Sequence, residues 1–202
     1  MRKLSVTNSV TLDGVMQAPG GPDEDRRGGF EHGGWAAPFN DSVMAQKMGE
    51  GMAKKSELLF GRRTYENFAS YWPLQTDNPF TEVLDNTQKY VASRTLGEPL
   101  PWKNSTLLNG DAADAVAALK EIEGPDLVIL GSGDLITSLA ERRLVDTYTL
   151  LIHPLVLGTG RRMFADGAAL AQFTLIDSVP TTTGVIIATY QLSGTAVERN
   201  SS

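Results

Sequence analysis

The chain has 202 residues, 41% of them hydrophobic, which suits one α/β domain with a substantial core. Its formal net charge of −6 argues against nucleic acid or an anionic membrane surface as the main partner, and the absence of cysteine excludes disulfides, thiolate catalysis and cysteine-ligated zinc. Because no stretch is apolar enough for a secretory signal or a membrane span, we expect a soluble cytoplasmic protein with a small-molecule partner.

The first predicted element is a strand over residues 2 to 12, where apolar residues alternate with mostly polar ones before an Asp13-Gly14 turn. Residues 17 to 38 follow with six glycines and three prolines, too many for the interior of a helix or strand. Such segments are usually lids over a binding site or surface inserts. We favour a lid, since Trp35 and Phe39 at its end need a packing partner; a static insert is the alternative.

The middle of the chain predicts helices and short strands. Helices are expected over residues 41 to 55, with Asn40 or Asp41 as N-cap, from about 62 to 68, and over 112 to 122, with Asp111 as N-cap. Strands are expected at 57 to 60, 90 to 92 and 105 to 108, and residues 70 to 87 are expected to form a loop with one short helix.

The stretch from Asp126 to Phe164 has the clearest pattern in the sequence. Residues 127 to 130 are a continuous apolar run, typical of a strand buried on both faces. A glycine turn follows at 131 to 133, then a helix with one apolar face, and then a second apolar strand at 148 to 156. Strand, turn, helix and strand together predict one right-handed crossover unit.

The C-terminal part predicts two strands, 173 to 179 and 185 to 192, joined by a short connection. So short a connection implies an antiparallel hairpin, which we place at the edge of the sheet. Since no linker or repeat divides the chain, residues 1 to 194 are expected to form a single domain and residues 195 to 202 a disordered tail.

Three strand ends carry residues suited to an anion. The Gly-Ser-Gly turn at 131 to 133 lets an anion approach the backbone N–H groups at a helix start. Gly61-Arg62-Arg63-Thr64 opens another helix, where guanidinium groups and the helix dipole favour phosphate. Ser93-Arg94 ends a third strand. An ordinary tight turn at 131 to 133, and solvated arginines at 62 and 63, are the alternatives.

In order and spacing, the motifs GRRTYENF at 61 to 68, SRT at 93 to 95 and LGSGDLITSL at 130 to 139 resemble the dihydrofolate reductase-like family. SVTLDGVM at 9 to 16 and LVDTYTLLIHPLVLGTGRRMF at 144 to 164 are similar to motifs of one branch, the C-terminal reductase domain of riboflavin-biosynthesis deaminase-reductases. The resemblance implies a mostly parallel twisted central sheet flanked by helices, an antiparallel C-terminal hairpin and a homodimer.

The cofactor of that family is NADPH, and the resemblance assigns residues to its parts. The turn that holds the pyrophosphate and approaches the 2′-phosphate is matched by Gly61, Arg62, Arg63 and Thr64, and a further 2′-phosphate contact by Ser93 and Arg94. The turn beside the diphosphate and nicotinamide ribose is matched by Gly131, Ser132, Gly133, Asp134, Leu135 and Ile136. The arginines also favour NADPH over NADH on grounds of charge.

The resemblance gives fewer residues for the substrate. Asp41 lies in the stretch where dihydrofolate reductases carry a catalytic carboxylate, although its position also suits an N-cap. Asp13 matches the Asp of an Asp-Gly motif in the family and is a second catalytic or substrate-binding candidate, or else a turn residue. Trp35 and Phe39 are candidate substrate contacts, and His153 either packs within its strand or faces the ligand.

We therefore expect an NADPH-dependent reductase that transfers a hydride to a C=N or C=O carbon of a pteridine, pyrimidine or ribosylamine compound, without a bound metal. A riboflavin-type reductase domain acting alone is a second interpretation. Leu130 stands where riboflavin reductases usually have a glutamate, and this departure argues against the riboflavin pathway. A third is a protein that binds nucleotide or pterin without turnover, which the lack of an unambiguous acid favours.

Overall fold

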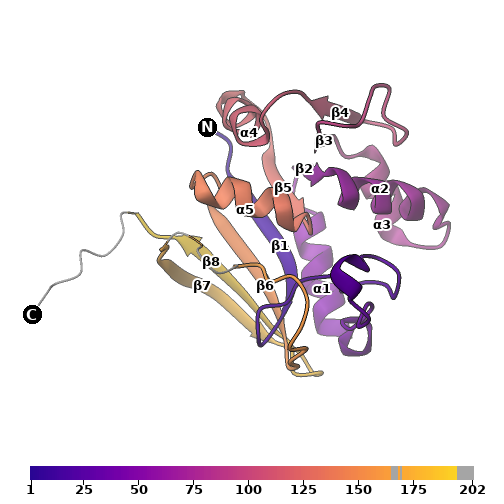
Figure 1. Cartoon of the computed structure of the whole chain (residues 1–202), viewed down its shortest axis with the longest axis vertical. Coiled ribbons are helices and arrows are strands. Elements are labelled where there is room, and N and C mark those ends of the chain that lie inside the picture. The colour runs from indigo at the N-terminus through magenta and orange to yellow at the C-terminus, as the bar shows by residue number, and fades with distance from the viewer. Residues whose placement is uncertain (165–167, 169, 195–202) are drawn as a thin grey trace, which may run out of the picture.

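The computed structural model of the chain describes residues 1–164, 168 and 170–194, which are built around one eight-stranded sheet. Its strand order is β4-β3-β2-β5-β1-β6-β8-β7 (Figure 1). The strands are β1 (Leu4–Thr11), β2 (Ser56–Gly61), β3 (Lys89–Ala92), β4 (Ser105–Leu108), β5 (Asp126–Leu130), β6 (Thr147–His153), β7 (Phe173–Pro180) and β8 (Ile186–Leu192). From β4 to β6 neighbouring strands are parallel, and β8 is antiparallel to both β6 and β7. The predicted parallel sheet with an antiparallel edge hairpin is confirmed.

In the described part of the chain, five α-helices cover the two faces of the sheet: α1 (Ser42–Met52), α2 (Arg62–Tyr71), α3 (Pro79–Asn86), α4 (Ala112–Glu121) and α5 (Gly133–Glu141). On one face α4 and α5 pack with Leu59 and Leu127, and on the other α2 and α3 pack with Leu58 and Phe60. The helix α1 lies farther along this second face (Figure 1). Its Met44 packs in one cluster with the β6 residue Leu151. None of the helices in the described residues has the length and apolar content that crossing a bilayer requires.

The crossover from β5 through α5 to β6 passes over β1, because β5 and β6 pair with opposite edges of that strand. The carboxyl ends of β1, β2, β3 and β5 consequently meet at one edge of the sheet, where ligands bind in folds of this kind. The segment from residue 17 to 38, called the insert below, leaves this edge after β1 and contains only the 3₁₀ turns Arg27–Gly29 and Ala37–Phe39.

Some predicted boundaries were wrong. β1 ends at Thr11, because a turn begins there that is closed by the hydrogen bond from the Gly14 N–H to the Thr11 carbonyl at 2.9 Å; Leu12, in this turn, is 64% exposed. β6 ends at His153 rather than Val156, since Pro154 has no N–H group to continue the ladder. The helix α1 ends at Met52, short of the predicted residue 55. The predicted tail at 195 to 202 lies outside the described residues.

One lysine is completely buried on the face covered by α2 and α3. Lys89 Nζ donates to the carbonyl oxygens of Leu84 at 2.7 Å, Asp85 at 3.3 Å and Thr87 at 2.7 Å, around the end of α3. Nζ also lies 4.4 Å from the ring centroid of Trp102. Burial penalises the ammonium and lowers the pKa of Lys89 to about 8.

Candidate functional site

A cleft of about 820 Å³ extends across the carboxyl ends of β2, β3 and β5. Its walls include residues 61–64 at the start of α2, residues 92–94 after β3, and residues 130–135 around the start of α5. The structure therefore brings the three predicted anion-binding turns together. Of the residues matched to the cofactor, only Ile136 does not line the cleft, because its side chain is buried in the core.

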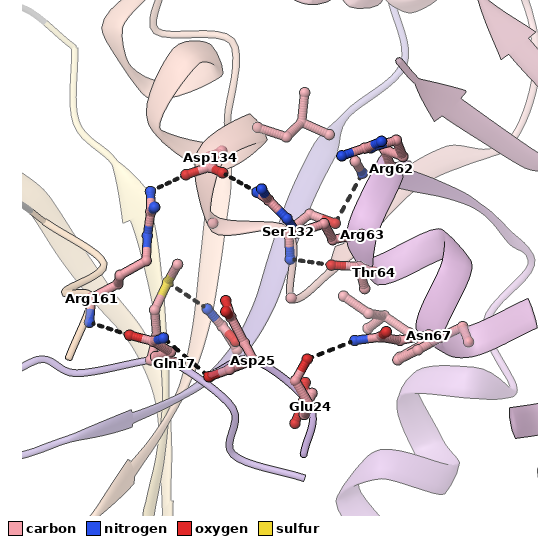
Figure 2. A pocket seen from close by; sticks show the side chains of 18 of the residues that line it. Gln17, Glu24, Asp25, Arg62, Arg63, Thr64, Asn67, Ser132, Asp134 and Arg161 are labelled. Carbon is pink, nitrogen blue, oxygen red and sulfur yellow. Dashed lines mark hydrogen bonds and ion pairs between the residues drawn. The ribbon is translucent and has the colours of Figure 1, made fainter. Parts of the chain in front are cut away.

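Two of these turns are joined by reciprocal hydrogen bonds. The Ser132 N–H donates to Thr64 Oγ1 at 3.0 Å (Figure 2), and Ser132 Oγ accepts from the Gly61 N–H at 3.0 Å. Ser132 has a left-handed backbone with φ of +60°. Since its side chain bonds Gly61 instead of capping α5, the N–H groups in the first turn of α5 are left for other partners, such as an anion.

Glycine is required at the two positions of this turn for different structural reasons. Gly131 has a positive φ of +65°, which glycine adopts at little cost. Gly133 has no such φ; a Cβ built there would lie 1.5 Å from Cε of Met16 and displace that side chain. The glycine at 133 thus makes room for Met16, which reaches the start of α5 from the segment after β1.

Asp134, the second residue of α5, bonds three arginines from separate parts of the chain. Its Oδ2 accepts from Arg63 in α2 at 3.3 Å, and its Oδ1 accepts from Arg161 after β6 (Figure 2). Oδ2 also accepts from Arg27 in the insert at 3.2 Å. We call these four residues the Asp134 cluster. The Asp134 side chain is 52% exposed and lies at the cleft. A half-exposed carboxylate with three guanidinium groups leaves excess positive charge at the start of α5.

Further charges surround this cluster. Arg27 also pairs with Asp25, and the hydrogen bond between them is the main reason that the pKa of the Asp25 carboxyl lies below its usual value. Arg62 and Arg94 line the cleft and form no ion pair with the described residues. The cleft as a whole therefore presents guanidinium groups from five positions to a ligand.

The insert is a packed structure above one wall of the cleft. Phe30 and Trp35 are buried in a small core with Val15. The buried side chain of Gln17 donates through Nε2 to the carbonyls of Asp25 and Arg27, at 3.1 and 3.0 Å, and accepts through Oε1 from the Arg161 N–H at 3.0 Å. Gln17 thus joins the insert to the loop after β6. Motion of the insert on ligand binding stays a prediction.

Asp41 has the structural role of a helix N-cap, which was the alternative to a catalytic role. It is the N-cap of α1, where its Oδ1 accepts from the Met44 N–H at 2.8 Å. Its Oδ2 accepts from both the N–H and the hydroxyl of Thr182 at 2.6 Å, and the hydroxyl bond is the main cause of a lowered pKa. Asp41 does not line the cleft. The α1 side chain that does is Met48.

Asp13 likewise bonds within the fold and does not line the cleft. Its carboxylate accepts from the Thr11 hydroxyl at 2.5 Å and from the N–H groups of Leu157 and Gly158, and the Thr11 bond is the main cause of its lowered pKa. Asp13 therefore ties the turn after β1 to the loop after β6, which is more than an isolated turn residue would do.

Trp35, Phe39 and His153, the other predicted substrate contacts, pack on one another beside the cleft rather than lining it. The His153 ring centroid lies 5.1 Å from that of Trp35 and 5.5 Å from that of Phe39, both edge-to-face. His153 is fully buried, Nδ1 lies 2.9 Å from the Leu151 carbonyl oxygen, and burial lowers the pKa of its imidazole. These contacts pack the C-terminal end of the insert against the end of β6.

Several cleft residues were not predicted: Thr7, Asn8 and Ser9 of β1, Met16, Gln17, Arg27, Met48, Asn67, Leu151 and Arg161. For β1 a signal was available, because polar residues in the middle of a central, twice-covered strand need a polar space beside them. Asn8 is buried and donates to the Met16 sulfur at 3.2 Å. Within the described residues, no group of three His, Asp or Glu side chains is arranged to hold a metal ion.

Comparisons with known proteins agree with this geometry. The chain is similar over 200 residues to the uncharacterized protein YyaP of Bacillus subtilis, at 26% identity and 96% coverage of both chains. Among solved structures, it resembles a putative riboflavin biosynthesis protein from Shewanella sp. PV-4, with a TM-score of 0.68, 22% identity, and coverage of 96% of this chain and 99% of the other.

Two further structures share the fold at lower identity. One is a pyrimidine reductase-like protein from Corynebacterium diphtheriae, with a TM-score of 0.60, 12% identity, and coverage of 95% and 92%. The other is a dihydrofolate reductase from Enterococcus faecalis in complex with NADP(H) and RAB-propyl, with a TM-score of 0.57, 14% identity, and coverage of 94% and 96%. The family model of the RibD C-terminal domain matches residues 2–187, nearly the whole chain. The sequence resemblance is thereby confirmed, and the chain belongs to the RibD C-terminal domain family.

Proposed function

We propose that this protein is an NADPH-dependent reductase that transfers a hydride to a C=N or C=O carbon of a small heterocyclic or ribosylamine substrate. The observation that carries the proposal is the convergence of two helix starts and five arginines on one cleft. Family membership and the dihydrofolate reductase-like fold support a reductase. The cofactor and the reaction are the steps that this proposal adds.

The charged part of the cleft suits the phosphates of NADPH. The free N–H groups of the first turn of α5, together with Arg63, would hold the diphosphate. Arg62 and the Ser93-Arg94 strand end lie on the side of α2 and β3, where they would contact the 2′-phosphate. Bound NADPH would supply the hydride.

A second part of the lining is uncharged and comes from β1, the segment after it, α1 and β6: Thr7, Asn8, Ser9, Met16, Met48 and Leu151. Methionine and leucine side chains would pack on a flat ring and exclude water, while the Asn8 amide and the hydroxyl groups would orient polar atoms of the substrate. The work of these residues would be positioning and desolvation, which can lower a barrier by several kcal/mol.

Titration of the protein with NADPH and NADH tests the cofactor assignment. We expect Arg62→Gln and Arg94→Gln to weaken NADPH by roughly 1.5–3 kcal/mol each, the range for a hydrogen bond to a charged group, and to leave NADH much less affected. Arg142→Gln is the matched control, since Arg142 pairs with Asp114 and does not line the cleft. Equal weakening of both cofactors would contradict the assignment.

A second function, binding of nucleotide or pterin without turnover, is favoured by one observation. Asp13 and Asp41 are both engaged in bonds that hold the fold, and neither lines the cleft. NADPH oxidation in the presence of pteridine, pyrimidine and carbonyl substrates separates the two functions. Tight binding of NADPH with no oxidation by any member of the panel would favour the binding protein.

A further inference from the structure

We infer that the Asp134 carboxylate competes with the anionic part of the ligand for the same arginines. By occupying the arginines that would bind a diphosphate, it sets the affinity of the cleft for the ligand. The inference rests on the proposed function for the identity of that ligand. It is carried by the Asp134 cluster, in which one carboxylate accepts from arginines of the insert, of α2 and of the loop after β6.

The position of Asp134 makes it equivalent to a bound anion. It is in the first turn of α5, where the helix dipole and the unbonded N–H groups attract negative charge. Its two oxygens receive all three guanidinium groups, so two of the arginine contacts share one oxygen: those from Arg27 and Arg63 are 3.2 and 3.3 Å long and both reach Oδ2, while Arg161 contacts Oδ1. A diphosphate offers more oxygens and more charge, and would satisfy these groups better.

The competition has a cost for the ligand. A diphosphate at the start of α5 would draw the arginines from Asp134 and would then face an uncompensated carboxylate at short range. The carboxylate is therefore unfavourable for anion binding, although it is favourable in the free protein, where it keeps Arg27 and Arg161 aimed at the cleft. Monoanions, which cannot replace all three contacts, should be excluded more strongly than polyanions.

A purely structural ion-pair network would give a different result. If the cluster only stabilised the fold, removing Asp134 would lower stability and leave anion affinity unchanged or reduced, because the arginines would lose their order. The competitor role requires the opposite change, which is tighter binding after loss of the carboxylate. The sign of the change in affinity therefore decides between the two.

The experiment compares Asp134→Asn and Asp134→Ser with the wild type, using inorganic pyrophosphate and NADPH as probes. Asp114→Asn is the matched control, because Asp114 also pairs with an arginine, Arg142 directly after α5, at 2.9 Å, but does not line the cleft. We expect both Asp134 variants to bind both probes about five-fold more tightly at low salt, a change in the range for one exposed ion pair, with a smaller gain at high salt. Asp114→Asn should stay within two-fold of the wild type.

Thermal unfolding first establishes that the variants are folded, and the serine variant keeps the test available if asparagine disturbs α5. Unchanged or weaker pyrophosphate binding by a folded Asp134 variant would overturn the inference. If pyrophosphate binds more tightly to the variants but NADPH binds to none of the proteins, the proposed function fails while the role of Asp134 stands.

Discussion

Replacing Ser132 by alanine and by glycine separates two contributions of this residue to the site. Its hydroxyl oxygen accepts from the Gly61 N–H at 3.0 Å, and its backbone has a φ of +60°. Alanine removes the acceptor and keeps the left-handed strain of a residue with a Cβ. Glycine removes the acceptor and the strain together.

The magnitudes follow from these two terms. Loss of the hydrogen bond should cost about 1 kcal/mol of unfolding free energy. A non-glycine residue in the left-handed region costs roughly 1–2 kcal/mol, and glycine relieves this strain. Glycine also has a larger conformational entropy in the unfolded state, which lowers the stability again by about 0.5–1 kcal/mol. We therefore expect Ser132→Ala to lose about 1 kcal/mol and Ser132→Gly to remain within about 0.5 kcal/mol of the wild type.

Urea unfolding measures the stabilities, and NADPH titration measures the site. Because both variants lose one of the two hydrogen bonds that hold the α2 turn to the α5 turn, both should bind NADPH more weakly, the glycine variant despite its nearly unchanged stability. Thr64→Val removes the reciprocal bond to the Ser132 N–H and should weaken NADPH in the same way. Equal destabilisation by alanine and glycine would refute the strain argument, and unchanged NADPH binding in all three would refute the role of the paired bonds.

Three further predictions concern the fold and the insert. The pKa of Lys89 is about 8 when folded and near 10.5 when unfolded, so the unfolded state holds more protons between these values; urea unfolding from pH 8 to 10 should show the wild type gaining stability relative to Lys89→Met as pH rises. Gly160→Ala should cost at least about 2 kcal/mol in the same assay, because φ is +107° and a Cβ would lie 2.6 Å from the Phe30 ring. Gly158→Ala, with positive φ but open space, should cost about half as much. Hydrogen exchange should show residues 17–38 becoming more protected when NADPH binds; equal protection with and without NADPH would make the insert a static structure.

The elements that sequence predicted well are those whose signal is local. The apolar run at 127 to 130 and the glycine turn after it are β5 and the start of α5, and Asp41 and Asp111 cap their helices as capping chemistry requires. The three strand-end motifs share one cleft because parallel strands all present their carboxyl ends to the same edge.

Long-range side-chain contacts were not predictable in this way. No periodicity connects Arg27, Asp134 and Arg161, which are more than twenty residues apart in every pair and meet only because the insert and the loop after β6 both return to the start of α5. For the insert, the sequence predicted only that Trp35 and Phe39 at its end need packing partners. The contacts of Gln17 and Phe30 were missed for the same reason, since the composition of the insert indicates flexibility while its order depends on partners elsewhere in the chain.

The cleft has two chemically different parts, and this division has a consequence for how variants should behave. Arginines surround the starts of α2 and α5, whereas Asn8, Met16, Met48 and Leu151 form a neutral wall beside β1. The arginines at the first part would interact equally with a bound ligand in its ground state and in the transition state, so they would contribute mainly to binding affinity. Under the proposed function, the neutral wall would contact the group that accepts the hydride, and it would therefore act on the barrier to reaction. Substitutions near α5 should therefore change affinity, and those at Met16 or Met48 should change turnover at saturating cofactor.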